Sequence, residues 1–157
     1  MKALTSILVA VVVLGFSLAA PTAFAQDFYS LISEEEYSAE LKAPEEEYFE
    51  RAQTDPLGPI IGLLRPGDGK KFKTPIDIEL KFEAADGSEI DLGTLKITYG
   101  TLGIDVTERV IENAILTETG LISENAKLPV GKHKLTVTIS DTAGRVGKKR
   151  FKFQIVK

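Results

Sequence analysis

Two runs near the C-terminus, residues 132–140 and 145–156, alternate between apolar and polar side chains. Their apolar positions are Leu135, Val137, Ile139, Phe151, Phe153 and Ile155. Successive side chains of a β-strand point to opposite faces, so each run predicts a strand with one apolar and one solvated face. The residues Asp141-Thr142-Ala143-Gly144 between the runs are typical of a turn, and we therefore expect a β-hairpin.

Similar apolar segments precede this hairpin. They predict strands in residues 60–64, 76–83, 94–99, 104–106 and 115–122, separated by turn residues at intervals of about ten residues. About seven short strands with this spacing predict an all-β, antiparallel sandwich with Greek-key connections. The expected core contains Ile78, Leu80, Leu95, Ile97, Leu135, Val137, Ile139, Phe151 and Phe153.

Three motifs in the same part of the chain add to this pattern. They are Arg65-Pro66-Gly67-Asp68-Gly69, Asp91-Leu92-Gly93-Thr94-Leu95 and Leu128-Pro129-Val130-Gly131-Lys132-His133. In these motifs the chain resembles bacterial immunoglobulin-like (Big-type) domains over about residues 59–157. The resemblance implies an immunoglobulin-like β-sandwich of the kind that serves as a spacer, adhesive module or support in secreted and surface proteins. This chain carries one copy, whereas such domains usually occur as repeats.

Residues 1–25 have the pattern of a secretory signal peptide. Lys2 precedes an apolar run over residues 4–18, and Ala23-Phe24-Ala25 suits cleavage before Gln26. The alternative is an uncleaved membrane anchor, for which the apolar run is short. No second apolar span follows, so we expect an exported protein, periplasmic or extracellular, without a transmembrane span after cleavage.

Residues 26–55 form an acidic leader with ten acids and two bases, a charge of about −8, whereas residues 56–157 carry about +3. Glu34-Glu35-Glu36-Tyr37 recurs as Glu45-Glu46-Glu47-Tyr48, and Ser33 with Glu36 fits a capping box. These features predict helices over about residues 28–42 and 45–53. A disordered linker is the alternative, because few apolar groups are present to offset the entropy of ordering.

The charge difference suggests a boundary at residues 55–56, with the immunoglobulin-like domain in 56–157. We expect the core to lie beyond this boundary, so that a chain beginning at Pro56 remains folded. The apolar leader residues Tyr37, Leu41 and Tyr48 are candidates for binding a partner.

Basic residues are concentrated in the C-terminal hairpin. They are Lys132, Lys134, Arg145, Lys148, Lys149, Arg150 and Lys152. A solvated face that protects an edge strand from aggregation explains such charges. The functional interpretation is a patch for an anionic partner: an envelope polymer, lipid headgroups, an acidic segment of another envelope or secreted protein, or the chain's own leader. Nucleic acid is not expected, because the mature chain is acidic overall and exported.

Residues suited to catalysis or metal binding are few. The chain has no cysteine, which excludes disulfides and thiolate metal sites, and its one histidine, His133, is expected to be exposed beside lysines. Asp86, Glu89 and Asp91 lie on a predicted turn and lack the spacing of an EF-hand loop. Residues 67–71 lack the spacing of a phosphate-binding P-loop and predict a turn with solvated lysines.

We therefore expect no catalytic residue, cofactor or metal. The favoured function is an exported, non-enzymatic binding or assembly module of the bacterial cell envelope or secreted fraction. The alternatives are a carbohydrate- or surface-binding accessory domain and, less favoured, a small hydrolase. Tyr99 has the parity of a core residue and no tryptophan is present, so the sequence offers little for stacking on a sugar.

Overall fold

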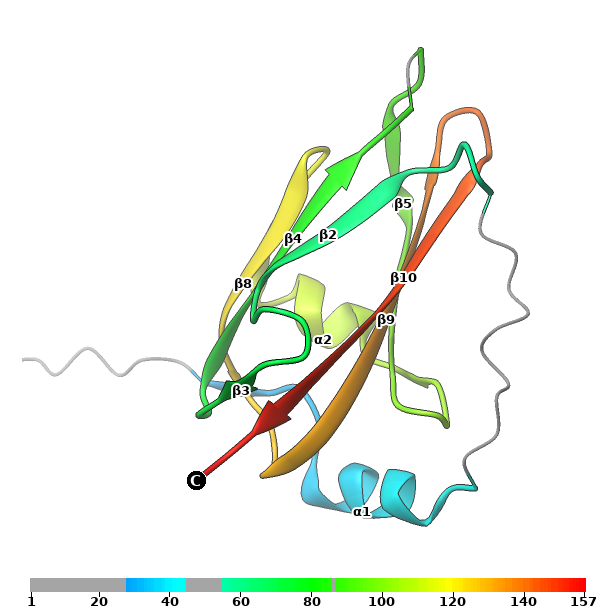
Figure 1. Cartoon of the computed structure of the whole chain (residues 1–157). Coiled ribbons are helices and arrows are strands. Elements are labelled where there is room, and N and C mark those ends of the chain that lie inside the picture. Colours follow the sequence, from blue (N-terminus) through cyan, green and yellow to red (C-terminus); the bar gives the residue numbers. More distant parts are fainter. Residues whose placement is uncertain (1–27, 45–54, 86) are drawn as a thin grey trace, which may run out of the picture.

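Two β-sheets pack face to face in the computed structural model, which describes residues 28–44, 55–85 and 87–157 (Figure 1). The first sheet contains β1 (Tyr29–Ser30), β2 (Ile60–Arg65), β4 (Ile76–Glu83), β7 (Ala114–Thr117) and β8 (Gly120–Lys127). The second sheet contains β3 (Lys71–Phe72), β5 (Ile90–Tyr99), β6 (Ile104–Asp105), β9 (Gly131–Asp141) and β10 (Val146–Ile155). The described residues also form the helices α1 (Glu34–Lys42) and α2 (Thr107–Ile111). This architecture confirms the predicted immunoglobulin-like β-sandwich.

The described residues form ten strands, more than the seven or so that the sequence predicted. In the first sheet β4 lies between β8 and β2, while β7 and β1 both pair with β8. In the second sheet the order is β3-β10-β9-β5-β6. The pairs β1–β8 and β3–β10 are parallel, and the other pairs are antiparallel. The strands β1 and β3, which the sequence did not predict, have two residues each, too few to show an alternating pattern. The predicted strand 115–122 is divided between β7 and β8, whereas the predicted short strand 104–106 is β6.

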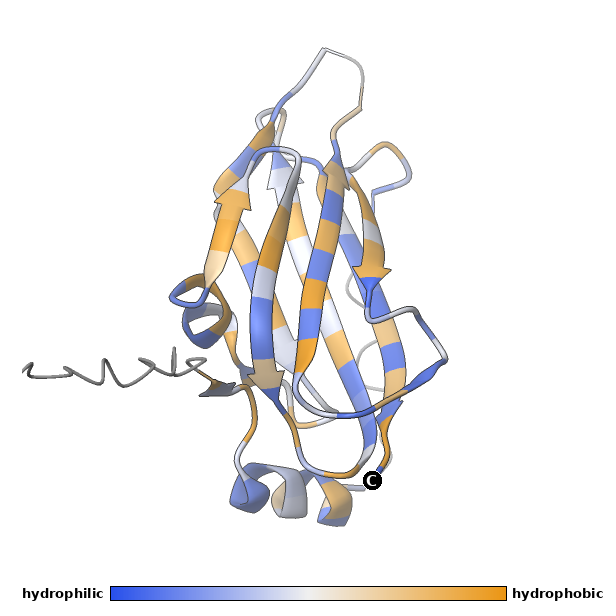
Figure 2. Ribbon diagram, turned by 90° about the vertical axis from the view of Figure 1, so that its left-hand side faces the viewer, coloured by the Kyte–Doolittle hydropathy of each residue, from blue (hydrophilic) through white to orange (hydrophobic). Residues whose placement is uncertain are grey.

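The core lies between the sheets and follows the predicted alternation. Apolar and polar residues alternate along the long strands in Figure 2, and β4 buries every second side chain from Ile76 to Phe82. The nine residues predicted for the core are all buried. The hydrophobic effect, about 25 cal/mol per Å² of apolar surface removed from water, therefore acts on the residues that the pattern singled out.

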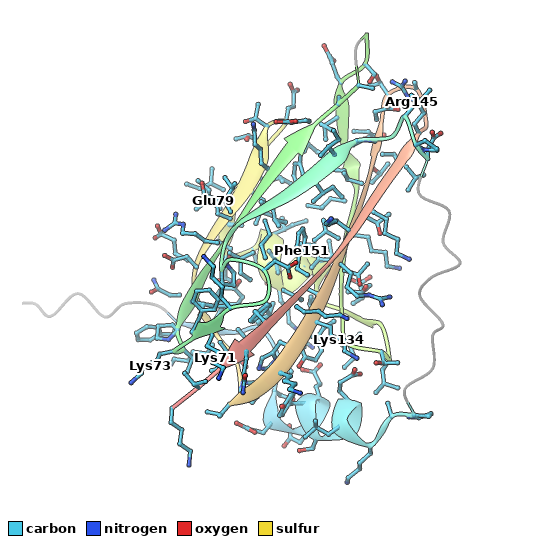
Figure 3. All side chains as sticks on the ribbon, viewed as in Figure 1. Lys71, Lys73, Glu79, Lys134, Arg145 and Phe151 are labelled. Atoms are coloured by element: carbon cyan, nitrogen blue, oxygen red, sulfur yellow. The ribbon has the colours of Figure 1, made fainter. Side chains whose placement is uncertain are left out.

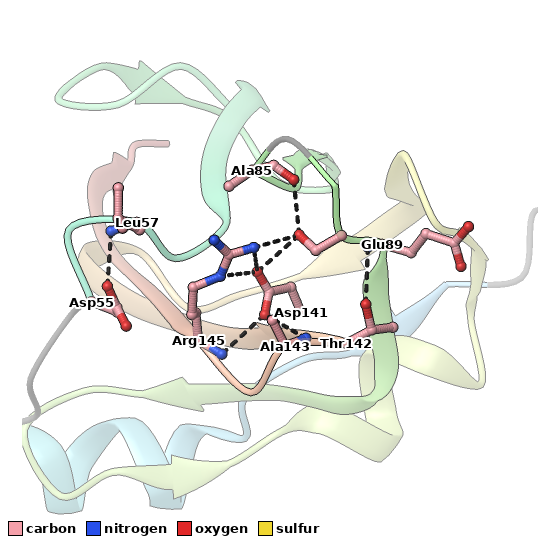
Figure 4. Close-up of polar contacts among 9 residues, drawn as sticks. Asp55, Leu57, Ala85, Glu89, Asp141, Thr142, Ala143 and Arg145 are labelled. Atoms are coloured by element: carbon pink, nitrogen blue, oxygen red, sulfur yellow. Dashed lines mark hydrogen bonds and ion pairs between the residues drawn. The ribbon is translucent and has the colours of Figure 1, made fainter.

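The turn of the β9–β10 hairpin depends on Asp141, whose carboxylate is buried (Figure 4). One oxygen accepts the backbone N–H groups of Ala143 (3.0 Å) and Arg145 (2.9 Å). The other accepts Nε of Arg145 (2.7 Å) and the hydroxyl of Ser88 (3.0 Å). Burial by itself raises the pKa of Asp141, but the hydrogen bonds from Arg145 and Ser88 outweigh it and lower this pKa below its ordinary value.

The described part of the acidic leader belongs to the sandwich. Leu31 and Ile32 lie in the hydrophobic core, and Tyr37 of α1 is buried. The capping box predicted at Ser33 and Glu36 is present, and the helix begins at Glu34. The change in charge near residue 55 is therefore not a boundary of the core, and the expectation that the whole core lies beyond it is wrong. The second predicted helix, 45–53, which includes Tyr48, lies outside the described residues.

Polar contacts dock α1 across one end of the sandwich (Figure 1). The guanidinium of Arg109 forms two hydrogen bonds with the Glu36 carboxylate, at 2.6 and 2.8 Å, and a third with the carbonyl of Leu31 at 3.1 Å. The hydrogen bond from Arg109 is the main cause that lowers the pKa of Glu36 to about 2. The Glu40 carboxylate accepts the backbone N–H groups of Thr101 and Leu102, which hold the turn after β5. The helix is thus fixed at both ends.

Two leucines of the leader test its role in stability. Leu31 is fully buried, whereas the side chain of Leu41 is 67% exposed. Leu31→Ala should lower the free energy of unfolding by about 2–5 kcal/mol, because it removes apolar contacts and leaves a cavity. Leu41→Ala should change it by less than about 0.5 kcal/mol. Urea denaturation of the two variants measures the difference, and equal effects would contradict the packing of the leader into the core.

Candidate functional site

The outer face of the second sheet is rich in basic side chains. The strand register places Lys148 opposite Thr138, Arg150 opposite Thr136, and Lys152 opposite Lys134. These residues have the parity that points away from the core, since their neighbours Phe151 and Phe153 point inward and are buried. We call this surface the basic face. Its basic residues are Lys71, Lys96, Lys132, Lys134, Lys148, Arg150 and Lys152.

The basic face includes five of the seven hairpin residues predicted from the sequence. Lys149 has the opposite parity, pairs with Val137, and is exposed at the edge of the sheet. Arg145 lies in the turn at the other end of the hairpin from Lys134, as Figure 3 shows, and its guanidinium is bound to Asp141 and Ser88. The structure therefore brings Arg145 together with a buried carboxylate and not with the other bases.

A cavity of about 230 Å³ opens on the basic face near the ends of β3, β9 and β10. It is lined by Gly69, Lys70, Lys71, Lys132, His133, Lys134, Lys152, Phe153 and Gln154. We call it the lysine pocket, because five of these residues are lysines and none is acidic. Within the described ranges, no ion pair involves any of the five.

Backbone hydrogen bonds hold the residue 67–71 segment against β10 and so build one wall of the pocket. The Asp68 carboxylate accepts the N–H of Lys152 at 2.8 Å, and the N–H of Gly69 donates to the carbonyl of Lys152 at 2.6 Å. The carbonyl of Lys70 accepts the N–H of Gln154 at 2.9 Å. Gly69 has φ +71°, a left-handed conformation that favours glycine.

Lys70 and Lys71 were missing from the sequence-based patch. Their segment was predicted as a turn with solvated lysines, which agrees with its local conformation. Their position beside Lys152 arises from the parallel pairing of β3 with β10, which joins residues about 80 positions apart. The only local signal was the glycine-rich turn followed by two lysines, and this signal does not indicate which strand the segment pairs with.

His133 forms part of the pocket wall and is buried, with 1% of its surface exposed, so the expectation of an exposed histidine is wrong. Its inward parity on β9 places the ring among Tyr37, Tyr99 and Phe153. Nε2 lies 2.8 Å from the carbonyl of Pro129, and since a carbonyl only accepts, Nε2 carries the proton. Nδ1 then accepts the hydroxyl of Tyr99 at 2.7 Å. Both ring nitrogens are therefore engaged in the neutral form.

The structure also separates the leader residues predicted to bind a partner. Tyr37 packs against His133 with ring centroids 5.2 Å apart, so its side chain is part of the chain's own hydrophobic core. Leu41 is exposed on α1. Tyr48 lies outside the described residues.

Two other kinds of site have no counterpart in the part of the chain that the structure describes. No group of three or more His, Asp or Glu side chains there is arranged to hold a metal ion. No described helix combines the length and apolar character needed to cross a membrane. Of the acidic residues considered on the turn, Glu89 donates its backbone N–H to the hydroxyl of Thr142, and the carboxylate of Asp91 accepts the N–H of Gly93. Asp86 is outside the described residues.

Comparisons with solved structures find partial likenesses at low sequence identity and with TM-scores below 0.5. No family model and no curated protein matches the sequence. An endo-β-1,4-mannanase from Thermotoga petrophila shares 14% identity at a TM-score of 0.45, with 69% of this chain and 21% of the mannanase covered. CopC from Methylosinus trichosporium OB3b shares 16% identity at a TM-score of 0.43, with 61% and 93% covered. Murine CRIg shares 11% identity at a TM-score of 0.37, with 63% and 98% covered.

The buried histidine predicts how stability depends on pH. Burial lowers the pKa of His133 in the folded chain, while an unfolded histidine titrates near pH 6.5. Unfolding in mild acid therefore takes up a proton, and the free energy of unfolding should decrease as the pH falls below about 6.5. Burial raises the pKa of Tyr99, so its hydroxyl stays neutral in this range.

Urea denaturation at pH 5, 6 and 7 measures this effect in wild type and in His133→Phe. The variant should be less stable at every pH, because the Tyr99 hydroxyl loses its acceptor, but its stability should change less between pH 7 and 5. His133 is the chain's one histidine, so the difference in slope isolates it. Parallel slopes would contradict a neutral buried His133.

Proposed function

We propose that the chain is an exported, non-enzymatic binding module of the bacterial immunoglobulin-like (Big-type) kind that binds an anionic polymer through its basic face. The observation that carries this proposal is the alignment of seven basic side chains on one face of the second sheet. The strand register places two acids on this face: Asp91, opposite Ser140, and Asp105, at the β6 edge, where it lies 3.7 Å from Lys96.

The two outer faces of the sandwich differ in charge. On the first sheet, Arg65 is bound to Asp77 and Glu79, and Lys81 is bound to Glu83. Two bases of that face, Arg65 and Lys81, are therefore balanced by neighbouring carboxylates. Such an asymmetry orients an approaching polyanion toward the second sheet and raises its association rate at low salt.

The contact should be reversible and sensitive to salt. Exposed charge pairs contribute about 0–1 kcal/mol each, and the Debye length is about 8 Å at 0.15 M salt. Several contacts along an extended polymer are needed for binding at this ionic strength. A sheet face with bases on four neighbouring strands, β3, β10, β9 and β5, supplies them. We place the protein in the periplasm or outside the cell, where such polymers occur, in accord with the signal-like residues 1–25.

A non-enzymatic role is supported by the state of His133. A general base needs a nitrogen within hydrogen-bonding reach of its substrate. Here Nδ1 accepts a bond from Tyr99, Nε2 donates to Pro129, and the ring is buried.

Charge reversal on the two faces tests the proposal. Lys132→Glu with Lys152→Glu alters the basic face, and Lys81→Glu with Lys127→Glu alters exposed lysines of the first sheet by the same total charge. On a dextran sulfate column at neutral pH, the first double variant should bind at least about tenfold more weakly, because two attractive contacts become repulsive. The second should elute close to wild type. Equal losses in the two variants would show that net charge, and not the basic face, governs binding.

A further inference from the structure

The lysine pocket gathers more bases than any ion-paired site of the described residues. Several described bases elsewhere have a carboxylate partner: Lys81 with Glu83, Lys96 with Asp105, and Arg109 with Glu36. The lysines at the pocket come from three segments that are distant in sequence, around a single cavity of about 230 Å³ without an acidic lining residue. Like charges gathered at short distances repel one another, and an anion placed between them relieves this repulsion.

We propose that the lysine pocket is a specific site for one tetrahedral oxyanion, a phosphate or sulfate ester, carried on the anionic polymer. The inference rests on the proposed function and deepens it, because it distinguishes a defined site from the broad attraction of the basic face. The residues assigned to the site are Lys70, Lys71, Lys132, Lys134 and Lys152.

The types of residue in the pocket favour a tetrahedral oxyanion over a planar carboxylate. Arginine presents a planar fork that matches a carboxylate, whereas the lysine ammonium is a compact charge whose three donors can be aimed in different directions. Ammonium groups approaching from several directions suit a tetrahedral group, with three outer oxygens and, for a phosphate ester, a charge of about −1.5 to −2 at neutral pH. Charge-assisted hydrogen bonds of this kind are roughly twice as strong as neutral ones.

The fold keeps the pocket walls in place before any ligand binds. The residue 67–71 segment is hydrogen-bonded to β10 through Asp68, Gly69 and Lys70. His133 is held by Tyr99 and Pro129, and its ring stacks on Phe153 with centroids 5.5 Å apart. Only the flexible lysine stems need to be ordered on binding, which limits the entropy cost.

Amide chemical shifts locate the site in the chain lacking residues 1–25. In ¹⁵N-labelled protein, inorganic phosphate and inorganic sulfate should shift the backbone amides of Gly69, Lys71, Lys134 and Lys152. Acetate at the same concentration should shift them much less. Shifts spread evenly over the basic face, or equal shifts with acetate, would overturn the oxyanion site.

Two double variants with the same change in charge separate the pocket from the face. Lys70→Ala with Lys71→Ala removes two pocket lysines, and Lys96→Ala with Lys149→Ala removes two exposed lysines of the second sheet outside the pocket. By calorimetry at 0.15 M salt, the pocket variant should bind polyphosphate or dextran sulfate at least about tenfold more weakly, and the control less than about threefold. Binding of either polymer supports the site, and the tighter one shows whether the site prefers a phosphate or a sulfate group.

The possible failures are distinguishable. Equal losses in the two double variants would refute the pocket and leave binding to the basic face intact. Polygalacturonate is a carboxylate polymer. If it binds as tightly as polyphosphate and dextran sulfate, selectivity for a tetrahedral oxyanion is refuted. No binding of any polymer by the wild-type chain would refute the proposed function itself. Thermal melting of each variant confirms that these exposed substitutions leave the fold unchanged.

Discussion

The two-residue period of the β9–β10 hairpin is the constraint on which the rest of the structure depends. Burial of Leu135, Val137, Phe151 and Phe153 against the first sheet turns the intervening lysines outward. A shift of one residue in register would move the apolar set into water and the lysines into the core. The buried Asp141 carboxylate helps to prevent such a shift, because it binds the turn and the guanidinium of Arg145 together. The same register therefore produces both the core and the basic face.

The N-terminal segment closes one end of this core, although its charge resembles that of a solvated leader. Acidic residues on α1 are used for docking: Glu36 binds Arg109, and Glu40 binds two backbone N–H groups of the turn after β5. Tyr37 reaches His133, whose backbone neighbours Lys132 and Lys134 line the lysine pocket. One buried imidazole thus lies between the docked helix and the candidate binding site. The packing of the leader and the shape of the pocket therefore both depend on the His133 ring.

The charges of the second sheet are arranged against the preference for local neutralisation. On the first sheet Arg65 and Lys81 are paired with adjacent acids, whereas the lysine pocket gathers lysines that have no ion pair among the described residues. Each exposed lysine keeps most of its hydration, so the cost to stability is small and the apolar core can tolerate it. Such an arrangement is compatible with folding and leaves a positive potential available to a ligand.

The sequence by itself determined the elements whose signal is local. Alternation along residues 76–83 and 132–156 predicted the long strands and the buried face of each, and Ser33 with Glu36 predicted the start of α1, because strand parity and helix capping involve residues close in the chain. Only the tertiary structure decided that Leu31 and Ile32 join the core, that Arg145 binds Asp141, and that His133 is buried. It also brought Lys70 and Lys71 to Lys152 through the parallel pairing of β3 with β10. These contacts link distant segments, and the physical reason that no local pattern reveals them is that burial and pairing depend on the partner segment as well as on the residue itself.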